Sequence, residues 1–79
     1  MAITSDQIKT VIKNQIRNPK LDLSDGTVKL DDLGIDSLDV VEILLSIEEE
    51  HNVIVMEDQL KRGCNLSEFI STIEAASAA

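Results

Sequence analysis

The chain has 79 residues, which is near the lower limit at which one hydrophobic core can hold a fold, so we expect a single domain spanning residues 1–79. Fifteen acidic and seven basic residues give a net charge of −8, which disfavours binding to nucleic acids or anionic membranes and favours partners with basic surfaces. Phe69 is the only aromatic residue, so the core is expected to consist of Ile, Leu and Val.

The first predicted element is a helix that begins after Thr4. Thr4 and Gln7 have the spacing of a capping box, and Ile3 and Ile8 have the spacing of a hydrophobic staple. Asn18 and Pro19 are expected to end the helix. Its apolar residues recur three and four positions apart, which predicts one buried stripe: Ile8, Val11, Ile12 and Ile16.

Residues 19–36 are predicted to form a long loop. Loops of this length are uncommon in compact domains and are often functional. Apolar residues occur throughout the segment, which predicts that it lies on the core: Leu21, Leu23, Val28, Leu30, Leu33 and Ile35.

A second helix is predicted from Ser37 to about His51, with Asp36 as its N-cap and Asp39 at the third helical position. Its apolar side chains cover an arc of about 220°, roughly twice what a surface helix needs. One explanation is that the rest of a small bundle covers this helix from several sides. The other is a docking strip, bordered by Asp39, Glu42 and Glu49, that includes Leu38, Val41 or Leu45. Both explanations can hold together.

In the last third of the chain, a short helical segment is predicted over residues 57–61, and Gly63 is expected to stop it. A longer helix is predicted to follow. Asn65 and Glu68 form a third capping box, and the apolar stripe that follows is Phe69, Ile70, Ile73 and Ala76. We expect the stretch HNVIV to be a connection and the terminal AASAA to fray. The predicted fold is all-α: a small four-helix bundle with three longer helices, one short third helix, and a long loop between the first two.

Ser37 permits two interpretations from its position alone. It is an ordinary polar residue for the first turn of a helix. It is also a hydroxyl displayed beside a glycine turn, where the free backbone N–H groups of a helix N-terminus favour a phosphate, although Asp36 and Asp39 oppose that charge. The sequence position leaves these two interpretations equal.

The chain lacks the residues for a self-contained active site. The only histidine, His51, would lie about 20 Å from Ser37 along the same helix, too far to activate it. One His and one Cys cannot form a structural zinc site, and the EF-hand pattern fails around both Gly26 and Gly34. We therefore expect neither an enzyme nor a bound metal.

Cellular location is predicted from features that the sequence lacks. Cys64 is the only cysteine, so it cannot form an internal disulfide; it suits a reducing compartment and is interpreted as a packed residue. The N-terminal MAITSDQIK has neither the basic start nor the apolar run of a secretion signal, and no segment approaches the length of a membrane span. We expect a cytoplasmic protein.

The stretch DDLGIDSLDVVEILLSIEEE resembles the attachment region of acyl carrier proteins. The residues that carry the resemblance are Leu33, Gly34, Asp36, Ser37, Leu38 and Asp39. The resemblance implies that a phosphopantetheinyl transferase attaches 4'-phosphopantetheine from coenzyme A to Ser37, and that the terminal thiol then holds acyl groups as thioesters. It implies that Asp36 assists recognition by the transferase.

The resemblance also implies a monomer that meets several enzymes in turn. These partners are acyl-transferring, condensing and modifying enzymes with basic docking surfaces, and the residues implied in docking are Leu38, Asp39, Glu42, Leu45, Glu48 and Glu49. The bundle of the family shelters the acyl chain among its helices, which fits the surplus of aliphatic residues.

Some residues depart from the pattern of the fatty-acid carriers. His51 stands where an aromatic residue is usual, Ile54 where an acidic one is common, and Met56 where proline is frequent. The segment with Lys61 and Arg62 is usually acidic. The functional hypothesis is therefore a stand-alone acyl carrier of type II fatty-acid synthesis or of a specialised lipid or polyketide pathway. The alternatives are an aminoacyl or peptidyl carrier, or a helical adaptor that carries no prosthetic group.

Overall fold

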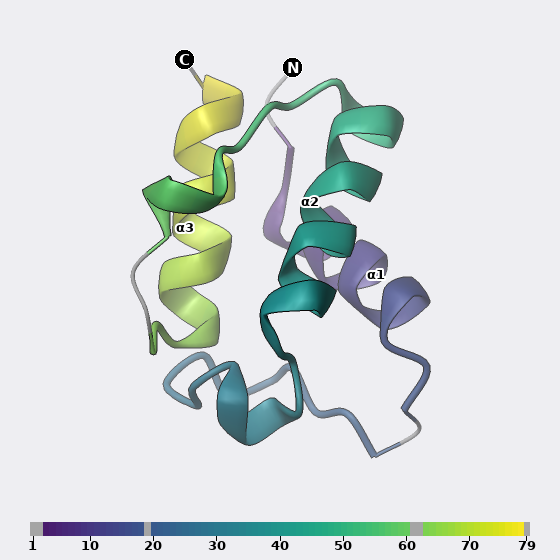
Figure 1. The fold of residues 1–79 in the computed structure, drawn as a ribbon, viewed down its shortest axis with the longest axis vertical. Coiled ribbons are helices and arrows are strands. Elements are labelled where there is room, and N and C mark those ends of the chain that lie inside the picture. Colours follow the sequence, from purple (N-terminus) through teal and green to yellow (C-terminus); the bar gives the residue numbers. More distant parts are fainter. Residues whose placement is uncertain (1–2, 19, 61–62, 79) are drawn as a thin grey trace.

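Three α-helices make up most of the computed structural model, which describes residues 3–18, 20–60 and 63–78 (Figure 1). They are α1 (Ser5–Gln15), α2 (Ser37–His51) and α3 (Leu66–Ala78), and single turns of 3-10 helix, η1 (Asp31–Leu33) and η2 (Glu57–Gln59), lie between them. The described ranges contain an isolated bridge between Lys29 and Asn65 but no strand. The predicted all-α class is confirmed.

The predicted short third helix is only one 3-10 turn, so three α-helices are found where a four-helix bundle was expected. The turn is held by the N–H of Gln59, which donates to the carbonyl of Met56 at 3.0 Å. Gly63 follows with a φ of 71°, a left-handed conformation that does not continue a helix. Residues 61 and 62, at the end of the predicted segment, lie outside the described residues.

Helices α1 and α3 begin at the capping boxes predicted for them. In α1 the N–H of Gln7 donates to Oγ1 of Thr4 at 3.2 Å, and the N–H of Thr4 donates to Oε1 of Gln7 at 2.9 Å. Asn65 and Glu68 make the same pair of bonds, at 2.8 and 3.2 Å, before α3. Helix α1 ends at Gln15, before the predicted Asn18, because Ile16 adopts an extended backbone.

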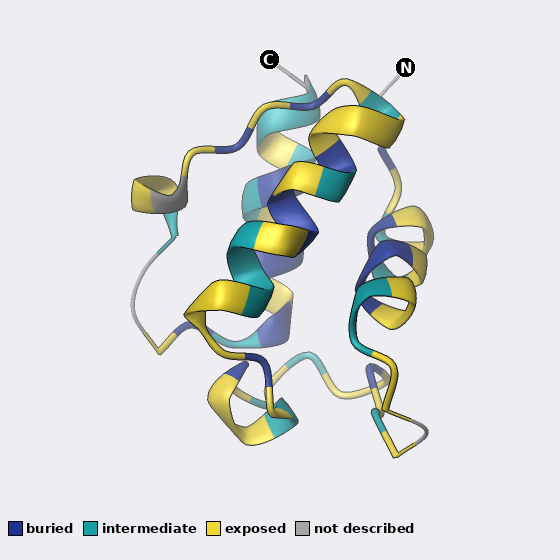
Figure 2. Cartoon of the chain, turned by 45° about the vertical axis from the view of Figure 1, so that its right-hand side comes forward, coloured by how far each residue is buried: buried dark blue, intermediate teal, exposed yellow. Residues whose placement is uncertain are grey.

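The core lies where the three helices face one another, and the buried residues follow their inner sides (Figure 2). Helix α1 packs against both α2 and α3, and η2 packs against α2. The stripes predicted for the first and last helices are buried except for two half-buried residues, Ala76 and Ile16, the latter just beyond the end of α1. The largest side chains that are fully buried are Phe69, Ile8, Ile12, Ile35, Ile43, Ile47, Leu66 and Ile73.

The long loop between α1 and α2 lies on the core and is tied to the beginning of α3. Backbone N–H groups of Leu66 and Ser67 donate to the carbonyls of Val28 and Gly26 at 3.0 and 2.9 Å, which satisfies donors that a helix N-terminus leaves free. The apolar loop residues that the sequence assigned to the core are buried or half-buried: Leu21, Leu23, Val28, Leu30, Leu33 and Ile35.

The expected fraying of the C-terminal stretch is wrong for residues 75–78, since α3 continues to Ala78. The N–H of Ile3 donates to Oγ of Ser77 at 2.9 Å, so the two ends of the described chain lie side by side (Figure 1). Within the described residues, no helix combines the length and the apolar character that crossing a membrane requires.

Candidate functional site

Ser37 is the first residue of α2, and the turn before it sets its position. The 3-10 turn η1 is followed by Gly34, whose φ of 78° puts its backbone in the left-handed region. Ile35 then enters the core, which anchors the backbone just before the helix. Ser37 itself is exposed, so its hydroxyl is open to a partner molecule.

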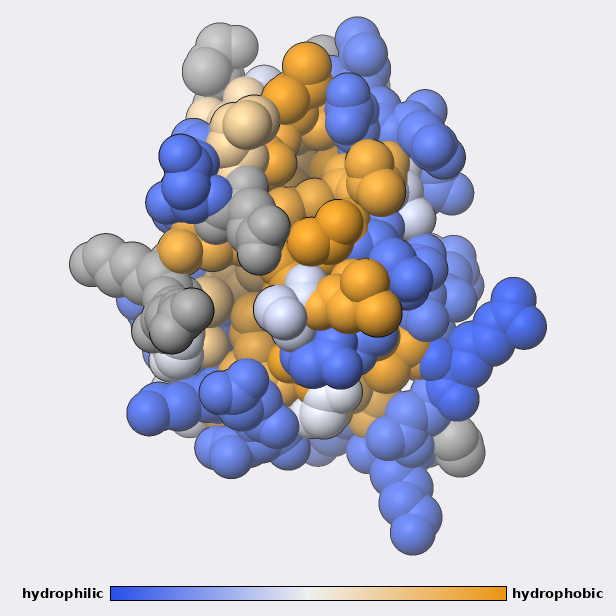
Figure 3. Space-filling view, viewed as in Figure 1, coloured by the Kyte–Doolittle hydropathy of each residue, from blue (hydrophilic) through white to orange (hydrophobic). Residues whose placement is uncertain are grey.

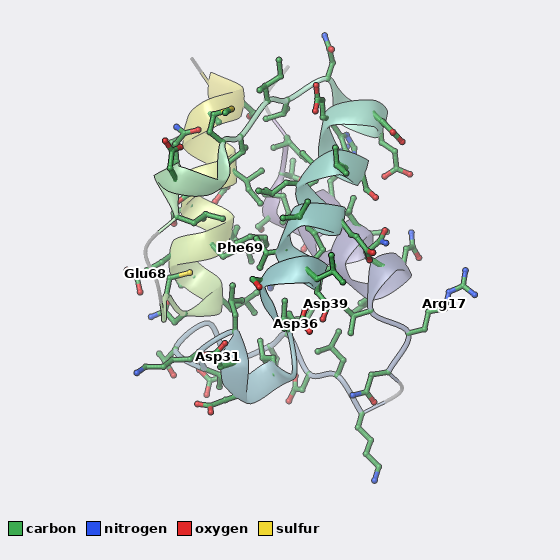
Figure 4. The ribbon with its side chains drawn as sticks, in the orientation of Figure 1. Arg17, Asp31, Asp36, Asp39, Glu68 and Phe69 are labelled. Atoms are coloured by element: carbon green, nitrogen blue, oxygen red, sulfur yellow. The ribbon has the colours of Figure 1, made fainter. Side chains whose placement is uncertain are left out.

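Asp36 and Asp39 form the capping box of α2, as predicted, and lie together at the start of the helix (Figure 4). Asp36 is exposed and Asp39 is half-buried. One oxygen of each carboxylate is engaged by a backbone N–H group, so both aspartates have a structural role in addition to any contact with partners. The cap places Ser37 in the first turn, with the positive end of the helix dipole beside its side chain.

A groove with a volume of about 1000 Å³ opens beside Ser37. One side is the first turn of α2, with Ser37 and Val40, and the other side is the segment around η2. The groove is lined by Leu30, Asp31, Ile35, Asp36, Ser37, Val40, Met56, Asp58, Leu60, Gly63 and Cys64. Its floor is apolar and part of its edge is acidic, so it suits a flexible chain with an apolar cargo.

The side of this groove that follows α2 could not be predicted from the sequence, because nothing in the spacing of Met56, Asp58 and Leu60 relates them to Ser37. The substitution of Met56 for a common proline was the one available signal.

The outward face of α2 is a strip of alternating apolar and acidic residues. Leu38 and Leu45 are 66% and 51% exposed, and Glu42 and Glu49 between and after them are also exposed. Their spacing of four, three and four residues places them in one row along the helix. Figure 3 shows apolar surface running along the middle of this face, with hydrophilic surface beside it.

The wide apolar arc of α2 is partly buried and partly exposed, which is the division that both explanations require. Ile43, Leu44 and Ile47 are buried, so part of the arc forms the core. Val41 is half-buried, and it lies next to the exposed row. Glu48 is exposed as well, which places all the carboxylates predicted for docking, except the half-buried Asp39, in solvent.

Helix α1 supports the acidic row through Gln15. Its Nε2 donates to Oε2 of Glu42 at 3.2 Å, and its Oε1 accepts from the hydroxyl of Ser46 at 2.9 Å. The side chain of Glu42 is thereby fixed in orientation on the surface of α2.

His51 lies too far from Ser37 to act as its catalytic base. His51 ends the same continuous helix, about 20 Å away along its axis. Among the described residues, no group of three or more His, Cys, Asp or Glu side chains is placed to hold a metal ion. Burial raises the pKa of the Cys64 thiol, and the carboxylate of Glu68 raises it further, so this thiol is a poor nucleophile at neutral pH.

Comparisons with known proteins identify the family of this chain. Residues 6–73 match the profile of the family described as "Phosphopantetheine attachment site". The chain is 32% identical over 74 residues to the "Acyl carrier protein" of Helicobacter pylori strain J99, an alignment that covers 94% of each protein. No solved structure gave a match.

Members of this family are carriers and not enzymes, and 4'-phosphopantetheine is covalently attached to this domain in acyl carrier proteins. The family profile covers most of the chain, and the relative is aligned over nearly its whole length. The chain therefore belongs to the family of phosphopantetheine-binding acyl carrier proteins.

Proposed function

We propose that Ser37 is the residue to which 4'-phosphopantetheine is attached and that the protein carries acyl groups between enzymes. The observation that carries the proposal is the placement of an exposed serine hydroxyl at the first position of α2, at the edge of the apolar groove. The terminal thiol of the attached group supplies the chemistry, because it holds acyl groups as thioesters.

The residues around Ser37 fit this group. A phosphate ester at the first turn of α2 lies beside free backbone N–H groups and the positive end of the helix dipole. The two capping carboxylates oppose a phosphate, but each has one oxygen engaged by a backbone N–H group. The apolar floor of the groove, which includes Leu30, Ile35 and Leu60, would hold the arm and shelter an acyl chain from water.

We assign the docking of partner enzymes to the outward face of α2 and its acidic border. Leu38 and Leu45 supply apolar contact area, and Glu42, Glu48 and Glu49 attract basic surfaces. The carboxylate of Asp39 also accepts a hydrogen bond in the cap of α2, so it serves both the helix and the docking surface. Asp36 lies next to Ser37, where a transferase must approach. The negative charge of the acidic border acts at long range and raises the rate at which basic partner enzymes meet the carrier. The apolar contact area is small, so the complex of carrier and enzyme can dissociate quickly.

The assignment of Ser37 is tested by incubating the purified protein with coenzyme A, Mg²⁺ and a broad-specificity phosphopantetheinyl transferase, and measuring the intact mass. We expect the wild type to gain one phosphopantetheine and Ser37→Ala to gain none. Ser71→Ala, which removes another exposed helical serine, is the matched control and should be loaded normally. Loading of Ser37→Ala would refute the assignment.

The same experiment separates a carrier from a helical adaptor. An adaptor is favoured by two results together. The folded wild-type protein gains no mass with several transferases, and the Ser37→Ala variant binds the partners as well as the wild type does. Circular dichroism establishes that both proteins are folded.

We further propose that the cargo is an acyl group of fatty-acid, lipid or polyketide synthesis. The exposed Ile54 and Met56, which replace residues common in the fatty-acid carriers, favour a specialised pathway. The intact mass of the protein purified from its own cells identifies the cargo directly. If the measured mass shows an aminoacyl group on Ser37, this proposal is wrong and the protein is an aminoacyl carrier.

A further inference from the structure

Two hydrogen bonds join the end of α1 to the outward face of α2. Gln15, the last residue of α1, donates from Nε2 to Oε2 of Glu42 at 3.2 Å and accepts at Oε1 from the hydroxyl of Ser46 at 2.9 Å. Glu42 and Ser46 are four positions apart, so they lie on the same side of α2. The amide of Gln15 therefore spans one turn of the neighbouring helix, and we call these three side chains the amide bridge.

The chemistry of the amide bridge permits one orientation. An ionised carboxylate only accepts hydrogen bonds, so the NH2 end of the Gln15 amide has to face Glu42. The carbonyl end of the amide then faces Ser46, whose hydroxyl has to donate. The two bonds form a chain that runs in one direction, and hydrogen bonds in such a chain polarise and strengthen one another. Ser46 thus supports the bond from Gln15 to Glu42.

Glu42 is the end of the amide bridge that a partner can reach. Gln15 and Ser46 are half-buried, whereas Glu42 is exposed. The bond from Gln15 uses Oε2 of the carboxylate, so Oε1 can accept from an ammonium or guanidinium group of a partner. Gln15 carries no charge, and it therefore orders the carboxylate of Glu42 without neutralising it.

The neighbours of Glu42 on α2 favour a disordered carboxylate. Asp39 precedes Glu42 by three positions, and like charges at this spacing on a helix repel each other. A glutamate in solvent also rotates about three side-chain bonds, and fixing such a side chain during binding costs free energy. The amide bridge orders Glu42 when the protein folds, so less ordering remains for the binding step.

We propose that Gln15 is a positioning residue for partner docking, which holds the carboxylate of Glu42 in the orientation that a basic group of the partner enzyme meets. This inference rests on the docking role proposed for Glu42. It makes α1 part of the recognition of partners, because a residue of α1 sets the orientation of a charge on α2. Gln15 acts through Glu42, and the partner does not have to touch Gln15.

The test measures kcat and KM separately for loading of the apo protein by a phosphopantetheinyl transferase at low salt. Gln15→Met, which has a similar length but no amide, should raise KM about two- to threefold and leave kcat unchanged, because it frees Glu42 only in the unbound carrier. Ser46→Ala should have a smaller effect of the same kind. Asn14→Met places the same side chain at the adjacent exposed position of α1 and should load as the wild type does.

Gln15→Glu separates positioning from charge. The two side chains have nearly the same shape, and the new carboxylate can still accept from Ser46 but cannot donate to Glu42. It also adds a negative charge beside a face that attracts basic partners, so attraction alone predicts faster loading. Positioning predicts the opposite result, a rise in KM of about threefold.

A double-mutant cycle with Glu42→Gln separates positioning from helix packing. If Gln15 acts through the charge of Glu42, Gln15→Met should no longer raise KM in the Glu42→Gln background. Three-bond couplings measured by NMR should show that the Glu42 side chain changes from one rotamer in the wild type to an average of several in Gln15→Met. Circular dichroism and thermal unfolding establish that each variant is folded.

Four other results would count against these assignments. A wild-type KM in Gln15→Met, when Glu42→Gln raises KM, refutes the inference and leaves the docking role of Glu42. The same rise in KM in both backgrounds also refutes it, because Gln15 then acts through helix packing. Faster loading of Gln15→Glu refutes it in favour of charge alone. A wild-type KM in Glu42→Gln refutes the proposed docking role of Glu42 itself, whereas the attachment to Ser37 is tested separately by the loading of the wild type.

Discussion

Asp36 and Asp39 cap α2 by exchanging hydrogen bonds. The N–H of Asp39 donates to Oδ1 of Asp36 at 2.9 Å, and the N–H of Asp36 donates to Oδ2 of Asp39 at 3.2 Å. The pair fixes the first turn of the helix, and with it Ser37, by bonds that involve no other element.

This cap predicts a measurable loss of stability. Asp36→Ala should lower the free energy of unfolding by about 1 kcal/mol, because it leaves the N–H of Asp39 without its side-chain acceptor. Urea denaturation checks this value. Asp32→Ala, which removes an exposed aspartate from η1, is the control and should change stability by less than about 0.5 kcal/mol. Equal losses in both variants would contradict a capping role.

Gly34 is predicted to be needed for its backbone conformation alone. Its φ is 78°, and an added Cβ would meet nothing within 4 Å. Gly34→Ala should therefore destabilise by about 1 kcal/mol through backbone strain, and Gly34→Asn by less, because Asn tolerates the left-handed region. Urea denaturation of the two variants gives the comparison. A larger loss with Asn would point to a steric clash instead of strain.

Cys64 is predicted to couple stability to alkaline pH. Burial raises the pKa of its thiol in the folded protein, so the folded state holds this proton more tightly than the unfolded state. The resulting stabilisation is complete below the unfolded pKa of about 8.5 and is lost as the pH rises through the folded pKa. Unfolding free energies at about pH 7 and about pH 9.5 should differ in the wild type and differ less in Cys64→Ala.

The same burial predicts how the thiol reacts. In the apo protein, iodoacetamide should modify Cys64 slowly under native conditions and rapidly in urea. Fast modification of the native protein would show that the groove opens far enough to expose the thiol.

Two loop carboxylates are predicted to titrate at unusually low pH. The hydroxyl and the backbone N–H of Thr27 donate to Asp25, and those hydrogen bonds lower the pKa of Asp25; Ser24 does the same for Asp22. Their stabilising contribution is present above the unfolded pKa of about 3.9 and is lost as the pH falls through the folded value. Thr27→Val removes the hydroxyl and should raise the pKa of Asp25 in an NMR titration, while that of Asp22 stays unchanged.

The acidic row of α2 is predicted to act on the rate of encounter. Glu42→Gln and Glu49→Gln should each lower kcat/KM for loading several-fold at low salt, and the difference should vanish at high salt because the charges are exposed. Glu74→Gln on α3 removes the same charge elsewhere and should have a smaller effect. If Glu74→Gln lowered kcat/KM for loading as much as the α2 variants do, the net charge of the protein, and not the acidic row of α2, would set the rate of loading.

The boundaries of the helices could be predicted where the signal is local. The capping boxes at Thr4, Asp36 and Asn65 each join residues three positions apart, so the sequence contains the whole interaction. The extent of η2 could not be predicted in this way, because its helical pattern is short and packing against α2 decides how far it continues. In the last turn of α3, Ser77 accepts a hydrogen bond from Ile3, a contact between opposite ends of the described chain that no local pattern encodes.

The site was predictable only in part for the same reason. Ser37 and its capping aspartates are contiguous, so their grouping follows from the sequence. The groove depends on η2 and on Cys64 being brought opposite Ser37, and no spacing encodes that approach. Ile54 resembles a core residue by its type, and only the folded structure shows that it faces solvent.

The hydrogen bond between Ile3 and Ser77 has a practical consequence for protein engineering. It brings the two ends of the described chain together at the end of the bundle away from the start of α2 (Figure 1). A short linker could therefore join them and allow new termini to be opened in an exposed loop, or the whole unit could be spliced into a surface loop of a host protein. In either arrangement the Ser37 hydroxyl would remain accessible.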